Sequence, residues 1–173
     1  PASLVKPRPE SLVAAVHKAD LQALPDYQDP FYEVPLLARQ PRPGQVIAEA
    51  EQPEQNVTEW TLSNGAHVVL KQTDFTSGEI RLVAIGPGGH SLAEDADLDS
   101  ARFADQVVHA SGLGDFDAVA LRKLLAGNTA SIEPAIEEDG QFLYGRTQPA
   151  DLETLMQLFY LGFTAPRRDP EAF

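Results

Sequence analysis

Apolar and polar positions alternate from residue 57 onward and predict three strands in succession. Two strand-like stretches, 57–62 and 66–71, flank Asn64-Gly65. Asn-Gly between two such stretches is typical of a tight hairpin, because both residues tolerate a positive φ. A third strand is expected at 79–86, and Pro87-Gly88-Gly89 ends it.

The apolar spacing becomes helical after this turn. One helix is predicted from Asp99 or Ser100, either of which can act as its N-cap, to about Ala110. A second runs from about residue 117 to Gly127-Asn128. Two more strands follow at 129–137 and 141–147. A last helix is predicted over 150–163, where five apolar residues share one face: Leu152, Leu155, Met156, Phe159 and Phe163.

The predicted order is β-β-β-α-α-β-β-α, with strands in hairpins and helices grouped together. Such an order favours an α+β fold in which an antiparallel-rich mixed sheet carries its helices on one face. We therefore predict an α+β domain over 51–173.

The first 50 residues have a different composition. They hold eight of the 14 prolines but only one of the 12 glycines, Gly44, which is typical of an extended connector. One helix is predicted near 9–24, and the remainder to about residue 56 is expected to be extended. Packing of four apolar residues would hold it on a domain, namely Phe31, Tyr32, Leu36 and Leu37. We interpret 1–50 as a Pro-rich interdomain linker.

Charge and composition exclude several functions. The formal net charge of −13 makes nucleic acid an unfavourable partner, because phosphate backbones are repelled. No apolar stretch reaches the roughly 20 residues that span a bilayer. The chain has no cysteine and hence no thiolate ligand or cysteine nucleophile.

Several ordered motifs resemble the insulinase/pitrilysin family of zinc metallopeptidases. The hairpin Thr61-Leu62-Ser63-Asn64-Gly65 is similar to the family's opening hairpin, and Gly86-Pro87-Gly88-Gly89 resembles its Gly-rich turn. Asp151-Leu152-Glu153 opens a helix like the family's, and Thr164-Ala165-Pro166 resembles the sequence that follows it. The likeness covers about 57–173 and implies the family's half-domain fold.

Active members carry H-x-x-E-H on the helix after the third strand, because two imidazoles four residues apart can bind one zinc ion. No such motif occurs in the 173 residues. The corresponding positions hold Arg102 and Gln106 in place of the two histidines and Asp105 in place of the glutamate. We therefore expect no catalytic, metal-binding or cofactor-binding residue here. Arg102 and Asp105 are expected to form an ion pair on this helix, the alternative being a solvated polar face.

The resemblance implies a parent zinc metalloendopeptidase built from two halves, one of them degenerate. This chain would be a connector and the truncated first part of the non-catalytic half, cut from a longer polypeptide and itself inactive. Its partners would be the catalytic half of the same polypeptide, which holds the zinc, and peptide substrate. A bacterial cell envelope suits the resemblance.

Two alternatives stay open. The chain could be a non-enzymatic interaction module that keeps the fold for subunit pairing, or an unrelated α+β domain that shares the hairpin and turn signals.

His109 could be a lone metal ligand, although one histidine on a helix is more often structural. The glycines before His90 could cradle an anion, although a simple tight turn is the commoner role of such a sequence.

Overall fold

The computed structural model describes residues 8–21 and 34–172. The chain divides into two compact units, Pro1–Tyr32 and Glu33–Phe173. The first contains helix α1 (Pro9–Asp20), with Pro9 in its first turn, where a missing N–H costs no hydrogen bond. A helix therefore lies within the predicted stretch 9–24, of which residues 22–24 lie outside the described ones.

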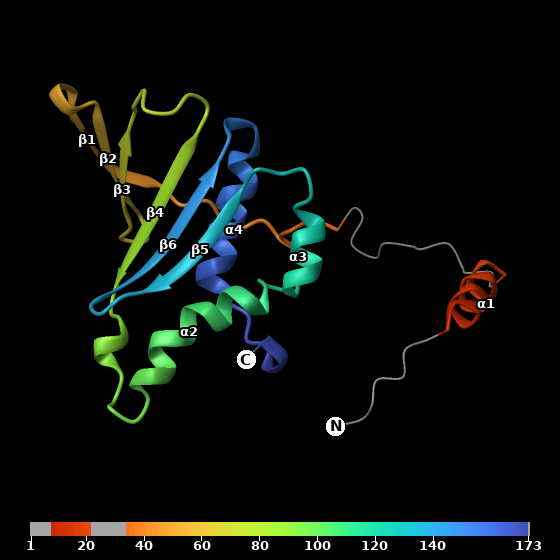
Figure 1. Ribbon diagram of the computed structural model, residues 1–173. Helices are drawn as coiled ribbons and strands as arrows, with labels where there is room; N and C mark the ends of the chain where they lie inside the picture. Colours follow the sequence, from red (N-terminus) through yellow and green to blue (C-terminus); the bar gives the residue numbers. More distant parts are fainter. Residues whose placement is uncertain (1–7, 22–33, 173) are drawn as a thin grey trace. The chain divides into compact units, whose positions relative to one another are not determined.

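The first sheet of the second unit has three antiparallel strands in the order β1-β2-β3 (Figure 1). They are β1 (Val46–Gln52), β2 (Val57–Leu62) and β3 (His67–Lys71). The predicted hairpin joins β2 to β3, with Gly65 at a φ of 85° and the Asn64 side chain accepting a hydrogen bond of 3.1 Å from the Ala66 N–H. The Asn64-Gly65 prediction is confirmed.

Strand β1 is absent from the predicted order, which has only extended chain at this position. Its sequence, Val-Ile-Ala-Glu-Ala-Glu-Gln, contains Ala and Glu residues that are poor strand formers in isolation. Pairing with β2 along its whole length overrides this weak local preference. The Trp60 indole N–H adds a hydrogen bond of 2.9 Å to the carboxylate of Glu49, the residue directly opposite.

The second sheet has the order β4-β6-β5, and both of its pairings are antiparallel. The central strand is β6 (Gly140–Thr147), and β4 (Ile80–Pro87) and β5 (Ser131–Ile136) are the edges. All three lie close to their predicted positions. Pro134 lies in β5, where it is tolerated because the edge strand has a second strand on one side only.

Three helices accompany the second sheet: α2 (Leu98–Ser111), α3 (Ala118–Leu124) and α4 (Leu152–Thr164). All three were predicted at these places. Asp117 caps α3 by accepting hydrogen bonds of 2.9 and 2.8 Å from the N–H groups of Val119 and Ala120. Short 3₁₀ turns lie at Pro53–Gln55, His90–Leu92, Pro149–Asp151 and Pro170–Ala172.

The hydrophobic core lies between α4 and one face of the second sheet. Leu155 and Leu158 of α4 are fully buried, and Leu143 of β6 lies against them. The predicted packing of Leu36 and Leu37 on the domain is confirmed, whereas Phe31 and Tyr32 lie outside the described residues. Further core members are Leu113, Ala130, Phe159 and Leu161.

Glycines allow the close approach of α4 to the sheet. A Cβ at Gly145 of β6 would overlap the Phe159 ring and lie 2.9 Å from a Leu155 methyl carbon. A Cβ at Gly162 of α4 would lie 2.8 Å from a methyl carbon of Leu143. Each glycine therefore makes room for a large side chain of the other element.

The predicted α+β fold class is confirmed, whereas the single mixed sheet is corrected: the described strands form two separate sheets, and every pairing within them is antiparallel. In the described part of the chain, no helix has both the length and the apolar character needed to cross a bilayer.

Candidate functional site

Helix α2 lies along edge strand β5 of the second sheet. Asp105 on this helix accepts a hydrogen bond of 3.3 Å from the backbone N–H of Ile136 through Oδ2. Its Oδ1 accepts one of 2.7 Å from the N–H of Gln106. The carboxylate is therefore used to fix the helix to the end of β5.

The three residues predicted to stand at the motif positions, Arg102, Asp105 and Gln106, do not gather at one point. Asp105 bonds to β5, whereas Gln106 lines a cavity of about 560 Å³ together with Phe103 and Ala172. Arg102 is exposed. Among the described residues, no ion pair joins Arg102 to Asp105, so the predicted pair is wrong. Two backbone N–H groups occupy the carboxylate that the guanidinium was expected to bind.

A second cavity, of about 580 Å³, lies where the end of α2 meets the second sheet on the face away from α4. The strand register arranges the side chains of this outer face in rows. Arg81, Arg146 and Ser131 lie opposite one another in one row, and the next row is Val83, Tyr144 and Glu133. His109 of α2 lines the same cavity. The sheet thus contributes two arginines, a serine, a tyrosine and a glutamate, and the helix contributes an imidazole.

Few contacts hold the two arginines. The Arg81 Nε–H bonds to the Glu79 carboxylate at 3.0 Å, and the Arg146 Nε–H bonds to the Ser131 hydroxyl at 3.4 Å. The Arg81 side chain is 76% exposed, so solvent screens its ion pair. Tyr144 stacks on Phe142 with ring centroids 5.8 Å apart and planes at 5°.

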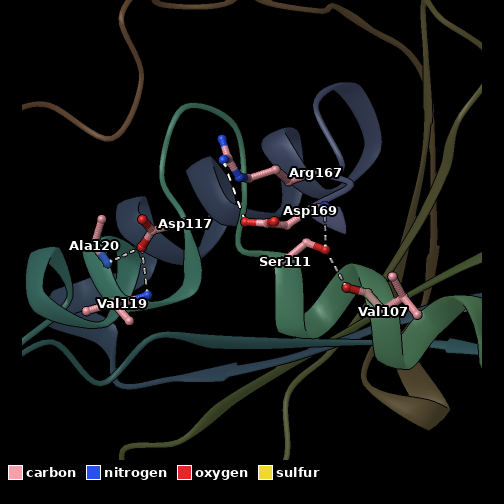
Figure 2. Close-up of polar contacts among 7 residues, drawn as sticks. All are labelled: Val107, Ser111, Asp117, Val119, Ala120, Arg167 and Asp169. Atoms are coloured by element: carbon pink, nitrogen blue, oxygen red, sulfur yellow. Dashed lines mark hydrogen bonds and ion pairs between the residues drawn. The ribbon is translucent and has the colours of Figure 1, made fainter. Parts of the chain in front are cut away.

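The end of α2 that carries His109 is held by the buried Ser111 (Figure 2). Its hydroxyl donates to the Val107 carbonyl at 2.6 Å and accepts from the Asp169 N–H at 2.9 Å. Arg167 forms an ion pair of 4.0 Å with the Asp169 carboxylate. One hydroxyl therefore links the helix to a segment 58 residues later in the chain.

A network around Asp151 holds α4 against the start of β5. The Asp151 carboxylate accepts hydrogen bonds from the Thr129 hydroxyl at 2.6 Å, the Thr129 N–H at 2.8 Å and the Asn128 amide at 3.1 Å. The side-chain hydrogen bond from Thr129, followed by its backbone hydrogen bond, lowers the pKa of Asp151 below its ordinary value of 3.8.

The Gly-rich turn offers no free anion cradle at two of its N–H groups. The N–H of His90 donates to the Glu137 carbonyl at 2.9 Å, and that of Ser91 donates to the Glu138 carbonyl at 3.0 Å. A Cβ at Gly89 would overlap the same two carbonyl groups. The turn therefore closes on the hairpin between β5 and β6, as expected for a tight turn.

Sequence reasoning did not identify the row of Arg81, Arg146 and Ser131. The alternation along β4 and β6 places each arginine on the exposed face of its strand, together with Val83, Ile85 and Tyr144, which is a visible signal. The register that sets them opposite each other joins residues far apart in sequence and follows from the fold.

Two curated proteins resemble the chain in sequence. A zinc protease PQQL-like protein of Arabidopsis thaliana is 28% identical over 137 residues, which cover 78% of this chain and 14% of that protein. A probable zinc protease PqqL of Haemophilus influenzae is 29% identical over 106 residues, which cover 61% of this chain and 11% of that protein. No family model matches the chain.

Two solved structures share the fold. The periplasmic protease PqqL from Escherichia coli superposes with a TM-score of 0.77 over 95% of this chain, at 19% identity. A variant of the ferredoxin protease FusC, in complex with Arabidopsis ferredoxin, superposes with a TM-score of 0.71 over 97%, at 25% identity. The chain is related to insulinase-type zinc proteases. It spans only 18% and 19% of the two solved chains.

Zinc, the metal in the names of the two curated relatives, does not fit the donors at the predicted motif positions of α2. The Arg102 guanidinium stays protonated and has no lone pair to donate. The Asp105 carboxylate accepts hydrogen bonds from two backbone N–H groups. The Gln106 amide is a neutral, weak metal ligand, and it lines a cavity that neither Arg102 nor Asp105 lines. In residues 8–21 and 34–172, no three His, Asp or Glu side chains come together as a metal site.

Proposed function

We propose that the chain is the metal-free, non-catalytic part of an insulinase-type zinc protease and that it helps to enclose the substrate chamber and contact peptide. The zinc would lie in the catalytic half of the same polypeptide, which would carry out hydrolysis. The relationship to named zinc proteases supports the family. The chain covers 14% and 11% of the length of these two proteins, so most of such a protease, its catalytic half included, would lie outside it.

The use of Asp105 is the observation that carries this proposal. In an active member, the acid at this helix position is free to act as a general base on a metal-bound water. Here the carboxylate joins the helix to Ile136, and Arg102 and Gln106 stand where imidazoles would be needed. The helix is thus anchored by the residue that would otherwise carry the chemistry.

The open outer face of the second sheet supports a role in peptide contact. Val83, Ile85 and Tyr144 on this face are 49%, 70% and 41% exposed. Apolar side chains next to hydrogen-bonding groups are common in ligand sites. The FusC neighbour was solved with a protein, ferredoxin, and the E. coli neighbour is periplasmic, so we propose a polypeptide substrate and a cell-envelope location.

Metal analysis combined with peptide hydrolysis tests the proposal. The purified chain is dialysed against zinc, its bound metal is measured, and cleavage of a quenched fluorescent peptide library is followed with and without chelator. We expect less than stoichiometric zinc and no chelator-sensitive cleavage. The control restores the motif with Arg102→His, Asp105→Glu and Gln106→His, and is expected to gain zinc, because imidazoles at i and i+4 share a helix face. Stoichiometric zinc on the unsubstituted chain would refute the proposal.

A second candidate is a non-enzymatic subunit-pairing module. Helix α4 favours it, because an exposed apolar stripe runs along the helix beside its buried face: Leu152, Met156, Tyr160 and Phe163 are 38%, 52%, 41% and 61% exposed. The apolar surface of the helix is therefore wider than the part that the second sheet covers, and a partner could cover the remainder. The reading frame distinguishes the two candidates, because an H-x-x-E-H in the same polypeptide favours the first and one in a separate chain favours the second.

A further inference from the structure

We propose that the cavity on the outer face of the second sheet binds a peptide carboxylate, with Arg81 and Arg146 as its principal ligands. This inference rests on the proposed peptide-contacting function. It goes further by naming the group that is recognised and the residues that recognise it.

Two like charges lie next to each other at this cavity. Arg81 and Arg146 are directly opposite each other across β4 and β6, which places their Cβ atoms ~5 Å apart. Like charges in such a pair repel and lower the stability of the sheet. An anion between the two guanidinium groups would turn this repulsion into attraction.

Most N–H donors of the two guanidinium groups make no hydrogen bond with the described residues. A guanidinium has five N–H donors, and the contacts with Glu79 and Ser131 involve only the Nε–H of each arginine. Neither guanidinium makes a further hydrogen bond or ion pair with the described residues. The terminal N–H groups are therefore available, and their fork matches the two oxygens of a carboxylate.

The wall of the cavity offers further hydrogen-bonding groups. Ser131 and Tyr144 offer hydroxyl groups, and His109 offers an imidazole, around the same cavity of about 580 Å³. Glu133 also lines it but lies one row away, opposite Tyr144. With Glu79 bonded to Arg81 and Glu133 in the next row, the charges at this place sum to about zero, whereas the chain as a whole has a formal net charge of −13. An acidic group is therefore repelled less here than by the surface as a whole.

Two sources can supply the carboxylate: the C-terminus of a peptide, or an internal Asp or Glu side chain. Four labelled peptides of one neutral sequence distinguish them. The first has an amidated end, the second a free C-terminal carboxylate, the third an internal Glu with an amidated end, and the fourth an internal Lys with an amidated end. Binding to the 173-residue chain is measured by fluorescence anisotropy at low and high ionic strength.

We expect a peptide with a carboxylate to bind roughly tenfold more tightly than the neutral one, as for a charge-assisted hydrogen bond in a partly exposed site. Added salt should reduce the difference. The double substitution Arg81→Gln and Arg146→Gln should abolish the preference. Arg122→Gln, which removes a charge on α3 outside the cavity, should keep it. Arg81→Lys with Arg146→Lys should keep only part of it, because Lys lacks the fork.

Equal binding of the neutral and acidic peptides, or a preference that survives the double Gln substitution, would overturn the carboxylate site while the peptide-contacting role stands. Absence of binding by all four peptides would instead overturn the peptide-contacting role, and the carboxylate site with it. Circular dichroism of each variant confirms that the fold is kept.

Discussion

The two sheets of this chain each have three antiparallel strands but differ in what lies against them. No residue of β1, β2 or β3 is buried, and their main contacts are the hydrogen bonds and side chains of neighbouring strands. The second sheet packs α4 onto one face and buries Leu143 and Thr147 in its central strand. The first sheet is thus held by the hydrogen bonds and contacts between its own strands, whereas the second sheet is also stabilised by side-chain packing against α4.

This difference predicts where stability is concentrated. In two-state unfolding, large losses come from cavities and overpacking in a core, and exposed positions contribute little. Substitutions in the covered sheet should therefore have large effects, and those in the uncovered sheet small ones.

The largest effect is expected for Leu158→Ala. Leu158 is fully buried under the second sheet, so its truncation should destabilise the chain by about 2–5 kcal/mol through lost burial and the cavity left behind. Urea unfolding followed by circular dichroism measures the change. Met156→Ala on the same helix is the control, because that side chain is 52% exposed and should cost less than about 1 kcal/mol. Similar losses for the two variants would contradict a core confined to one face of α4.

Overpacking at Gly145 comes next. The new Cβ in Gly145→Ala would overlap the Phe159 ring, and we expect a loss of about 1–3 kcal/mol in unfolding free energy. Gly86→Ala in β4 of the same sheet is the matched control, because a Cβ there would meet nothing within 4 Å. A Gly145→Ala variant as stable as Gly86→Ala would show that α4 can move away from the sheet without cost.

Acidification should weaken the link between α4 and β5. A carboxyl whose pKa is lower in the folded than in the unfolded state adds stability above its unfolded pKa, and this is lost as the pH falls through the folded pKa. Asp151 has such a lowered pKa relative to 3.8. The stability difference between the unsubstituted chain and Asp151→Asn should be constant near neutral pH and narrow below about pH 4. Asp95→Asn is the control, because the carboxylate that it removes is exposed. If the stability difference between the unsubstituted chain and Asp151→Asn widens on acidification, the lowered pKa of Asp151 is contradicted.

The smallest effect is expected in the uncovered sheet. Val69 in β3 is 64% exposed, and Val69→Thr should change the unfolding free energy by less than about 0.5 kcal/mol. Hydrogen exchange sharpens the comparison, because the amides of β1–β3 should exchange faster than those of β6. Equal protection of the two sheets would show that a further part of the protein covers the first one.

Much of the fold follows from local patterns. Asn64-Gly65 determined the hairpin, and the helical spacing from Leu152 to Phe163 predicted α4, since both signals lie within a few residues. Strand β1 could not be predicted, because its Ala and Glu residues become a strand only by pairing with β2. The division into two sheets likewise depends on contacts between distant segments.

The candidate site was less accessible to sequence reasoning. The absence of H-x-x-E-H could be read directly from the sequence, since the motif is one contiguous stretch. That Asp105 bonds to Ile136 rather than to Arg102 depends on how α2 lies beside β5. The pairing of Arg81 with Arg146 depends on the register of strands more than 50 residues apart in sequence.

The reciprocal fit of Gly145 and Gly162 restricts how α4 can be displaced. Each element has one glycine that leaves space and one large side chain that fills the space in the other element, so a shift of the helix along the sheet would take Phe159 and Leu143 out of the space that the glycines leave. The helix and the strand therefore fit each other in one relative position. A displacement of α4 would move β6 with it, and β6 is the strand that carries Tyr144 and Arg146.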